Sequence, residues 1–177
     1  MRFEQLEQNI IDMIKEEQAK LGYRKESIRL YYPLSSLVHL TGENLGEQEM
    51  LALLSEFGEE TKEHLGGVTV TAKKDRFCFL IPEEGVVYVK EHTSPNEFIH
   101  DLVNLVGTHG CTMDEIKALF EKQPWPVTVE PVNNEEFDIL IRFGEGADDP
   151  YYYCFKDEGC HIIYHRFLPE DYADFGF

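Results

Sequence analysis

Apolar residues at helical spacing mark the first 65 residues of the chain. Between Phe3 and Leu21 the apolar positions recur mostly every three or four residues, with acidic and lysine side chains between them. This pattern predicts an amphipathic helix over the stretch. The same spacing predicts a short helix that follows Pro33 and stops at Gly42, and a longer helix over residues 46–65.

The period of the pattern then changes from about 3.6 to 2, which indicates strands. Alternating or continuous apolar residues, bounded by turn residues, predict three strands at Val68–Thr71, Arg76–Ile81 and Val86–Val89. Because only short turns separate these strands, we expect them to form an antiparallel meander.

Two further helices and four strands complete the predicted elements. Ser94, Pro95 and Glu97 have the order of an N-cap, a first helical residue and the acid of a capping box. Thr112 and Glu115 repeat this capping signal for the second helix. Alternation then predicts strands at residues 127–132, 137–143, 151–155 and 160–164.

N-terminal helices, an antiparallel β meander, a helix pair and a second antiparallel β meander therefore follow one another along the chain. This block order predicts an α+β fold rather than a doubly wound parallel sheet. No flexible linker interrupts residues 1–177, so we expect a single α+β domain with a soft boundary near residues 92–95.

The charge balance limits the classes of partner. The chain has 34 Asp and Glu against 16 Lys and Arg, a formal net charge of −18 at pH 7. This charge repels nucleic-acid phosphates and anionic lipid head groups, so we expect neither nucleic acid nor a membrane as a partner. Charged residues in the first 20 positions and the lack of an apolar run of about 18 residues argue against a signal peptide and a membrane span. We therefore expect a cytoplasmic protein.

The four cysteines do not form a recognisable framework. They show neither a CxxC pair nor the Cys and His spacing of zinc modules, so the sequence predicts reduced thiols, no metal and no cofactor. These cysteines are Cys78, Cys111, Cys154 and Cys160.

Two segments carry a resemblance to a known family. They are Glu26–Leu37, which reads ESIRLYYPLSSL, and the aromatic segment Asp149–Phe155, which reads DPYYYCF. Through them the chain resembles an uncharacterised bacterial family of unknown function. The resemblance covers most of the chain and implies no activity, cofactor or catalytic residue at any position.

Several titratable residues are candidates for catalysis, although no complete catalytic motif is present. His100 and Asp101 are adjacent, as in metal-dependent phosphohydrolases of the HD class, but that class is all-helical and needs further ligands. His109 and Cys111 place an imidazole and a thiol in one inter-helix turn. A surface pair and a plain turn are the ordinary interpretations of these two patterns.

Other histidines and acids are weaker candidates. His161 and His165 share one face of a predicted strand, about 13 Å apart, so they cannot share a metal in a straight strand. His64 and His92 are available as further ligands, and Glu145, Asp148 and Asp149 lie in a Gly-rich loop where carboxylates can surround calcium. The loop lacks EF-hand spacing, so solvated acids are its ordinary interpretation.

The C-terminal segment is aromatic and acidic. Nine aromatic residues fall between Tyr151 and Phe177. Core packing explains most such residues, but aromatics rimmed by acids also form anchor patches for basic proteins. The residues we expect at such a patch are Asp148, Asp149, Tyr151, Tyr152, Tyr153 and Tyr172.

A second candidate surface lies in the one net-positive segment, residues 23–42. Basic and aromatic residues alternate there, which is compatible with an intramolecular or homodimeric contact with the acidic C-terminal region. Solvated salt bridges are the ordinary interpretation of this pattern. The residues are Tyr23, Arg24, Lys25, Arg29, Tyr31 and Tyr32.

The sequence thus predicts a protein-binding or regulatory module that engages a basic protein partner through its acidic and aromatic C-terminal surface. A homo-oligomer remains open. The alternative is a small hydrolase whose pocket combines His, Asp and Cys side chains from separate elements; enzymatic activity is uncertain, and the lack of a catalytic motif argues against it.

Overall fold

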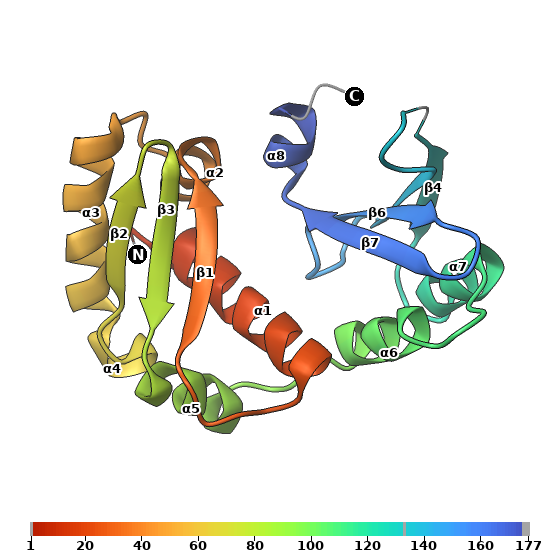
Figure 1. Cartoon of the computed structure of the whole chain (residues 1–177), viewed down its shortest axis with the longest axis horizontal. Helices are drawn as coiled ribbons and strands as arrows, with labels where there is room; N and C mark the ends of the chain where they lie inside the picture. Colours follow the sequence, from red (N-terminus) through yellow and green to blue (C-terminus); the bar gives the residue numbers. More distant parts are fainter. Residues whose placement is uncertain (1, 133, 175–177) are drawn as a thin grey trace. The chain divides into compact units, whose positions relative to one another are not determined.

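Helices and strands alternate in blocks along the chain, in a computed structural model that describes residues 2–132 and 134–174 (Figure 1). The chain divides into two compact units, Met1–Glu97 and Phe98–Phe177. Each unit combines helices with one antiparallel sheet, which confirms the α+β class. The division falls close to the soft boundary predicted at residues 92–95. Folding as a single domain stays a prediction.

The N-terminal unit contains sheet A, three antiparallel strands in the order β1-β3-β2. Its elements are α1 (Glu4–Leu21), β1 (Ile28–Pro33), α2 (Leu34–Thr41), α3 (Glu47–Glu60), α4 (Lys62–Leu65), β2 (Thr69–Lys73), β3 (Arg76–Ile81) and α5 (Glu83–His92).

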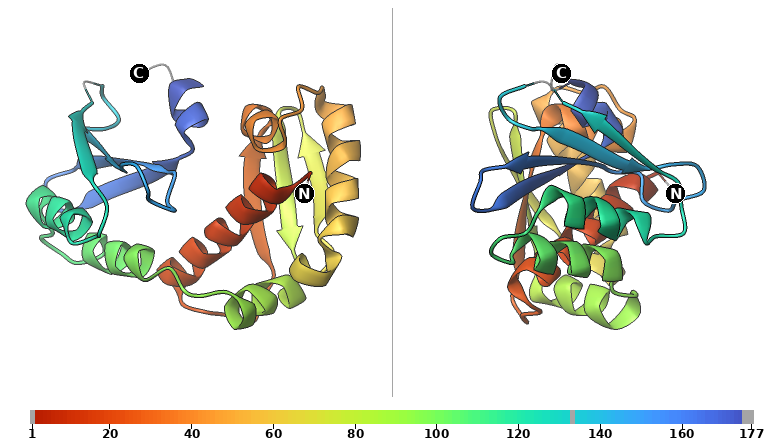
Figure 2. Two further views of the ribbon diagram at one scale, coloured as in Figure 1. Left: turned by 180° about the vertical axis from the view of Figure 1, so that it is seen from behind. Right: turned by 90° about the vertical axis from the view of Figure 1, so that its right-hand side faces the viewer.

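Helices α1 and α3 cover one face of sheet A (Figure 2, left). Tyr32 of β1 is buried and its hydroxyl donates to Asn9 of α1 at 2.7 Å. Phe57 of α3 packs edge-on against Phe79 of β3, with ring centroids 6.4 Å apart. Each fully buried phenylalanine contributes about 1.5–3 kcal/mol through its loss of water contact, so this face is the core of the unit. Among the residues that the structure describes, no helix of this unit lies on the opposite face of sheet A (Figure 1 and Figure 2).

Two expectations for the N-terminal unit are wrong in detail. Val86–Val89 is part of helix α5, because Val86 and Val89 lie three residues apart and are both buried on one helical face. A four-residue apolar run does not distinguish a strand from a buried helical segment. The third strand of sheet A is instead β1, which pairs with β3 and lies outside the strands expected from the sequence. The single helix expected at residues 46–65 is divided at Thr61 into α3 and α4.

The C-terminal unit contains sheet B, four antiparallel strands in the order β4-β5-β6-β7. This order confirms the second meander. Its elements are α6 (Glu97–Val106), α7 (Met113–Glu121), β4 (Val127–Pro131), β5 (Ile139–Phe143), β6 (Tyr152–Asp157), β7 (Ile162–Phe167) and α8 (Pro169–Asp174).

Both faces of sheet B are covered within this unit. Helices α6 and α7 lie against one face (Figure 2, right), where Phe120 of α7 meets Phe143 and Tyr153 with ring centroids 5.2 Å from its own in each case. On the other face Tyr172 of α8 packs on Tyr152 at 5.5 Å. The central strands are therefore buried from two sides.

Helix ends follow the predicted chemistry at α7 but not at α6. The Thr112 side chain caps α7 by accepting from the backbone N–H of Glu115. The Glu115 carboxylate in turn accepts from the backbone N–H of Thr112 at 2.8 Å. Helix α6 begins at Glu97, two residues later than the expected start at Pro95. Among the described residues, no helix is both long enough and apolar enough to cross a membrane.

Candidate functional site

Asp149 fixes the loop that joins β5 to β6. Its Oδ1 accepts from the backbone N–H of Tyr151 at 3.0 Å, and its Oδ2 accepts from the hydroxyl of Tyr153 at 2.6 Å. Burial, together with the neighbouring Asp149 carboxylate, raises the pKa of Tyr153 well above its usual value, so the phenol stays protonated and donates. Asp149 therefore stabilises the conformation of the β5–β6 loop.

Tyr151 and Tyr153 do not fit the anchor patch expected from the sequence. Their exposed fractions are 4% and 0%. The guanidinium of Arg166 lies over the Tyr151 ring, 4.3 Å from its centroid. Tyr153 lies in β6, an inner strand covered by helices on both faces, and Tyr151 directly precedes this strand.

Tyr152 and Tyr172 remain half-buried and keep part of their surface in solvent. Arg142 contacts Tyr152 through a hydrogen bond of 3.3 Å to the hydroxyl, and its guanidinium also pairs with Glu130 at 3.4 Å. Burial, followed by the nearby Cys154 and Glu130, raises the pKa of Tyr172. The two tyrosines are the members of the predicted aromatic set that retain a contact surface.

Exposed carboxylates gather where β5 ends, β6 begins and β7 leads into α8. Glu145 and Asp148 lie in the β5–β6 loop, and Glu170 lies in the first turn of α8. All three are exposed. Because Tyr152 pairs with Phe167 across β6 and β7, the loop and α8 meet at the same end of sheet B. We call Glu145, Asp148 and Glu170 the acidic end.

The charge of the C-terminal unit is not compensated within it. Residues 98–177 contain 16 Asp and Glu against five Lys and Arg. Five cations can neutralise at most five carboxylates, so at least eleven carry uncompensated charge. Thirteen of the acids are exposed: Asp101, Asp114, Glu115, Glu121, Glu130, Glu135, Glu136, Glu145, Asp148, Asp157, Glu158, Glu170 and Asp174.

Asp138, at the opposite end of sheet B, is tied to its neighbours. It accepts from the backbone N–H of Asp157 at 2.8 Å and from Lys156 Nζ at 3.1 Å. The backbone donor, assisted by Lys156, lowers the pKa of Asp138 below its usual value of 3.8. This acid stabilises the β6 strand end.

His100 and Asp101 form an exposed pair on α6. Their nearest nitrogen and oxygen are 3.8 Å apart, and both side chains are 63% exposed. The side-chain amide of Asn104 lies 3.2 Å from His100 Nδ1. The ordinary interpretation, a surface pair, matches this placement.

Cys111 and His109 lie in the turn between α6 and α7. The thiol of Cys111 donates to the carbonyl of Thr112 at 3.6 Å, and the described residues include no hydrogen bond between Cys111 and His109. Burial, then the charges of Glu115 and Asp157, raise the pKa of Cys111. A raised pKa keeps the thiol protonated, which is the opposite of what a nucleophile needs.

His161 and His165 lie at and within β7 and are exposed. His161 Nδ1 is 3.1 Å from Cys160 Sγ, while the ring of His165 packs at 4.2 Å from that of Phe167. The six catalytic candidates thus occupy α6, the α6–α7 turn and the β6–β7 hairpin. A hydrolase stays a prediction.

His64 and His92 flank one tyrosine in the N-terminal unit. Tyr88 stacks between them, with centroid distances of 5.2 Å to His64 and 4.3 Å to His92. His64 Nδ1 also lies 2.9 Å from a carboxylate oxygen of Glu7. Each imidazole is thus engaged in packing of its own unit.

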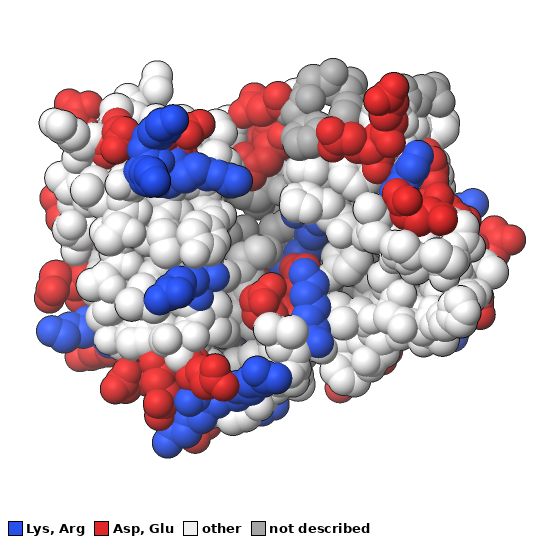
Figure 3. Space-filling model, viewed as in Figure 1, with Lys and Arg blue, Asp and Glu red and all other residues white. Residues whose placement is uncertain are grey.

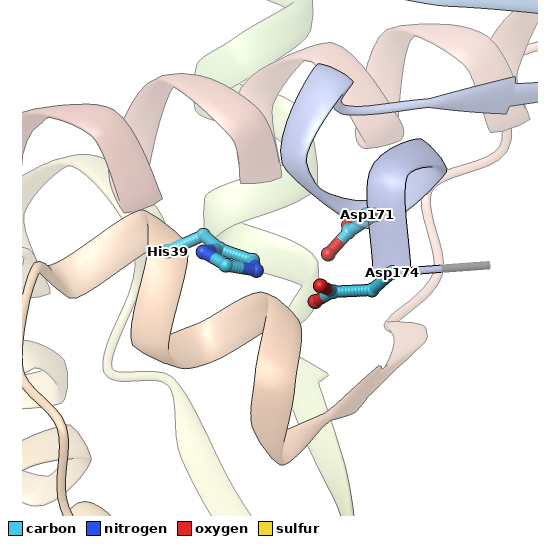
Figure 4. Close-up of side chains that lie close together, drawn as sticks. All are labelled: His39, Asp171 and Asp174. Atoms are coloured by element: carbon cyan, nitrogen blue, oxygen red, sulfur yellow. The ribbon is translucent and has the colours of Figure 1, made fainter. Parts of the chain in front are cut away.

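Figure 4 draws His39 of α2 with Asp171 and Asp174 of α8. The two aspartates are three residues apart, so they leave the same side of this short helix. His39 belongs to the N-terminal unit and the aspartates belong to the C-terminal unit. These residues are therefore not a site of either unit, and we infer no metal centre from them.

The basic and aromatic segment separates into inward and outward residues. Tyr32 faces the core, whereas Tyr31 is 63% exposed. Tyr23 is also exposed, with Lys90 Nζ 5.6 Å from its ring centroid, and Lys25 pairs with Glu83 at 3.5 Å. Alternation that indicates β1 is present in the sequence from residue 28, in the order apolar, basic, apolar, aromatic, and the strand ends at Pro33.

One comparison with known proteins finds a match. A family model described as "Domain of unknown function, E. rectale Gene description (DUF3877)" matches residues 3–176. This match confirms the resemblance to a family of unknown function. No curated protein and no solved structure matches the chain.

Proposed function

The chain belongs to the DUF3877 family, and from that premise we propose that it is a protein-binding module whose acidic end engages a basic protein partner. The single observation that carries the proposal is the excess of exposed carboxylates in the C-terminal unit, thirteen against five cations in all. Such an excess attracts a cationic surface and discriminates against anionic ones.

The acidic end supplies charge, and the half-buried tyrosines beside it supply contact area. Among the described residues, Glu145, Asp148 and Glu170 make no ion pair, and the rings of Tyr152 and Tyr172 pack against each other. Each exposed ion pair contributes under about 1 kcal/mol, so the affinity depends on several pairs together and falls with added salt. We include a cytoplasmic location in this proposal, because all four cysteines are free thiols.

Affinity capture with two charge-matched variants tests the proposal. The first variant, E145Q/D148N/E170Q, neutralises the acidic end. The control, E47Q/E60Q/E63Q, removes the same charge from exposed acids of the N-terminal unit. We expect the unaltered protein and the control to retain the same basic protein at low salt and to release it at high salt.

The acidic-end variant should retain that protein at least tenfold less. Equal capture by the acidic-end variant, or capture that high salt leaves unchanged, would show that the acidic end is not the binding surface.

A further inference from the structure

The uncovered face of sheet A has a composition opposite to that of the rest of the molecule. Strand alternation and register place nine side chains on this face, in three rows across β1, β3 and β2. None of the nine is acidic, and three are cations. The rows are Pro33, Arg76 and Lys73; Tyr31, Cys78 and Thr71; and Arg29, Leu80 and Thr69.

The cations of this face are exposed and have no internal counterion. Arg29, Lys73 and Arg76 are exposed, and among the described residues none of them makes an ion pair or a side-chain hydrogen bond. Figure 3 looks onto this face, where blue atoms lie on a white surface and red atoms stay at its margins. A local cationic face thus exists on a chain whose net charge is −18.

Tyr31 makes this face suited to protein contact. It stands in the middle row between the cations, with 63% of its surface exposed. Tyrosine and arginine are among the residue types that most often carry binding energy at protein interfaces. Leu80 and Cys78, both half-buried, provide apolar surface beside the Tyr31 ring. A nucleic acid is a poor ligand for this face, because three cations neutralise few phosphates and the surrounding acids repel the others.

We propose that this face docks the acidic end of a second copy of the chain. This inference rests on the proposed function, because both take the acidic end as a contact surface. It adds that a second copy of the chain is the basic partner of that surface. Charge complementarity supports the pairing, because the face has three cations and no acid while the acidic end has three exposed acids. At 0.15 M salt, the screening length of about 8 Å damps the repulsion between distant charges and leaves contacts of a few ångströms effective.

Sedimentation velocity of the full chain tests the proposal. At 0.15 M salt we expect association that increases with concentration, and its loss at about 1 M salt, where screening reaches about 3 Å. The R29E/R76E variant should associate at least tenfold more weakly. The control K62E/K122E, which changes the charge equally at exposed cations outside this face, should behave as the unaltered chain.

A mixing experiment separates this contact from a general charge effect. R29E/R76E keeps the acidic end, and E145K/D148K keeps the basic face. Each variant alone should be monomeric, and their mixture should form heterodimers, because one intact surface of each is available to the other. A head-to-tail contact predicts this complementation, whereas a symmetric contact of identical surfaces does not.

Several results would overturn the inference. Unaltered protein that stays monomeric up to about 1 mM, the weak limit of a specific contact, would do so. So would a mixture without heterodimers, or tight binding of a labelled single-stranded oligonucleotide that R29E/R76E abolishes. If self-association fails while the acidic end still captures a basic protein, the inference fails alone. If the acidic-end variant loses neither activity, the proposed function fails.

Discussion

The hydrogen bond from the Tyr153 hydroxyl to Asp149 is the contact whose removal tests most directly how the β5–β6 loop is stabilised. Replacing Tyr153→Phe deletes the donor to Asp149 at 2.6 Å and keeps the buried ring in place. The Asp149 carboxylate then retains the Tyr151 N–H and loses the phenol. The control is Tyr152→Phe, the same chemical change at the next residue.

The structure gives different magnitudes for the two substitutions. A hydrogen bond to a charged group contributes about 1.5–3 kcal/mol, and the Tyr153 bond is short and joined to a side chain with no exposed surface. We therefore expect Tyr153→Phe to lower the free energy of unfolding by about 2 kcal/mol. The Tyr152 hydroxyl accepts one bond of 3.3 Å from Arg142 at a half-exposed position, so its loss should cost under about 1 kcal/mol.

Urea unfolding followed by tryptophan fluorescence measures this difference within the right unit. The chain has one tryptophan, and Trp125 lies in the C-terminal unit, with its ring 5.6 Å from that of Phe143. The midpoint should fall clearly for Tyr153→Phe and little for Tyr152→Phe, with equal slopes. Equal costs for the two variants, or a cost below about 0.5 kcal/mol for Tyr153→Phe, would refute the role assigned to this bond.

Two further predictions concern titration and reactivity. Asp138 has a lowered pKa, so its carboxylate stabilises the fold above pH 3.8 and loses that effect as the pH falls below 3.8. Asp138→Asn should therefore unfold more easily at neutral pH, and its difference from the unaltered chain in acid unfolding should shrink below about pH 3.8; a constant difference would contradict this. Cys160 is exposed, whereas burial raises the pKa of Cys154 to about 12. Alkylation followed by peptide mass spectrometry should modify Cys160 first and Cys154 only on unfolding, and equal rates would contradict the structure.

The sequence predicted those elements whose pattern is long or whose capping chemistry is complete. Helix α1, the Thr112 cap and the meander of sheet B belong to this group. Periodicity over many residues and a specific hydrogen-bonded cap leave little choice of structure. The short run Val86–Val89 failed because four apolar residues satisfy either period, and the packing of α5 decided the outcome.

The candidate site was less predictable, because it depends on which faces are covered. Strand alternation correctly places Tyr151 and Tyr153 on one face of sheet B and Tyr152 on the other. Only the tertiary structure shows that helices cover both faces of β6. An exposed aromatic side chain with cations beside it is Tyr31, in strand β1, which lies outside the elements expected from the sequence. Acids are easier to predict, since Glu145 and Asp148 lie in a loop where water is the ordinary environment.

Carboxyl-group footprinting of the captured complex tests the central claim most directly. Labelling of exposed Asp and Glu, read by peptide mass spectrometry, compares the chain alone with the chain bound to its basic partner. The account predicts protection at Glu145, Asp148 and Glu170, and unchanged labelling at Glu47, Glu60 and Glu63. Protection at the N-terminal acids, with the acidic end labelled as in the free chain, would contradict it.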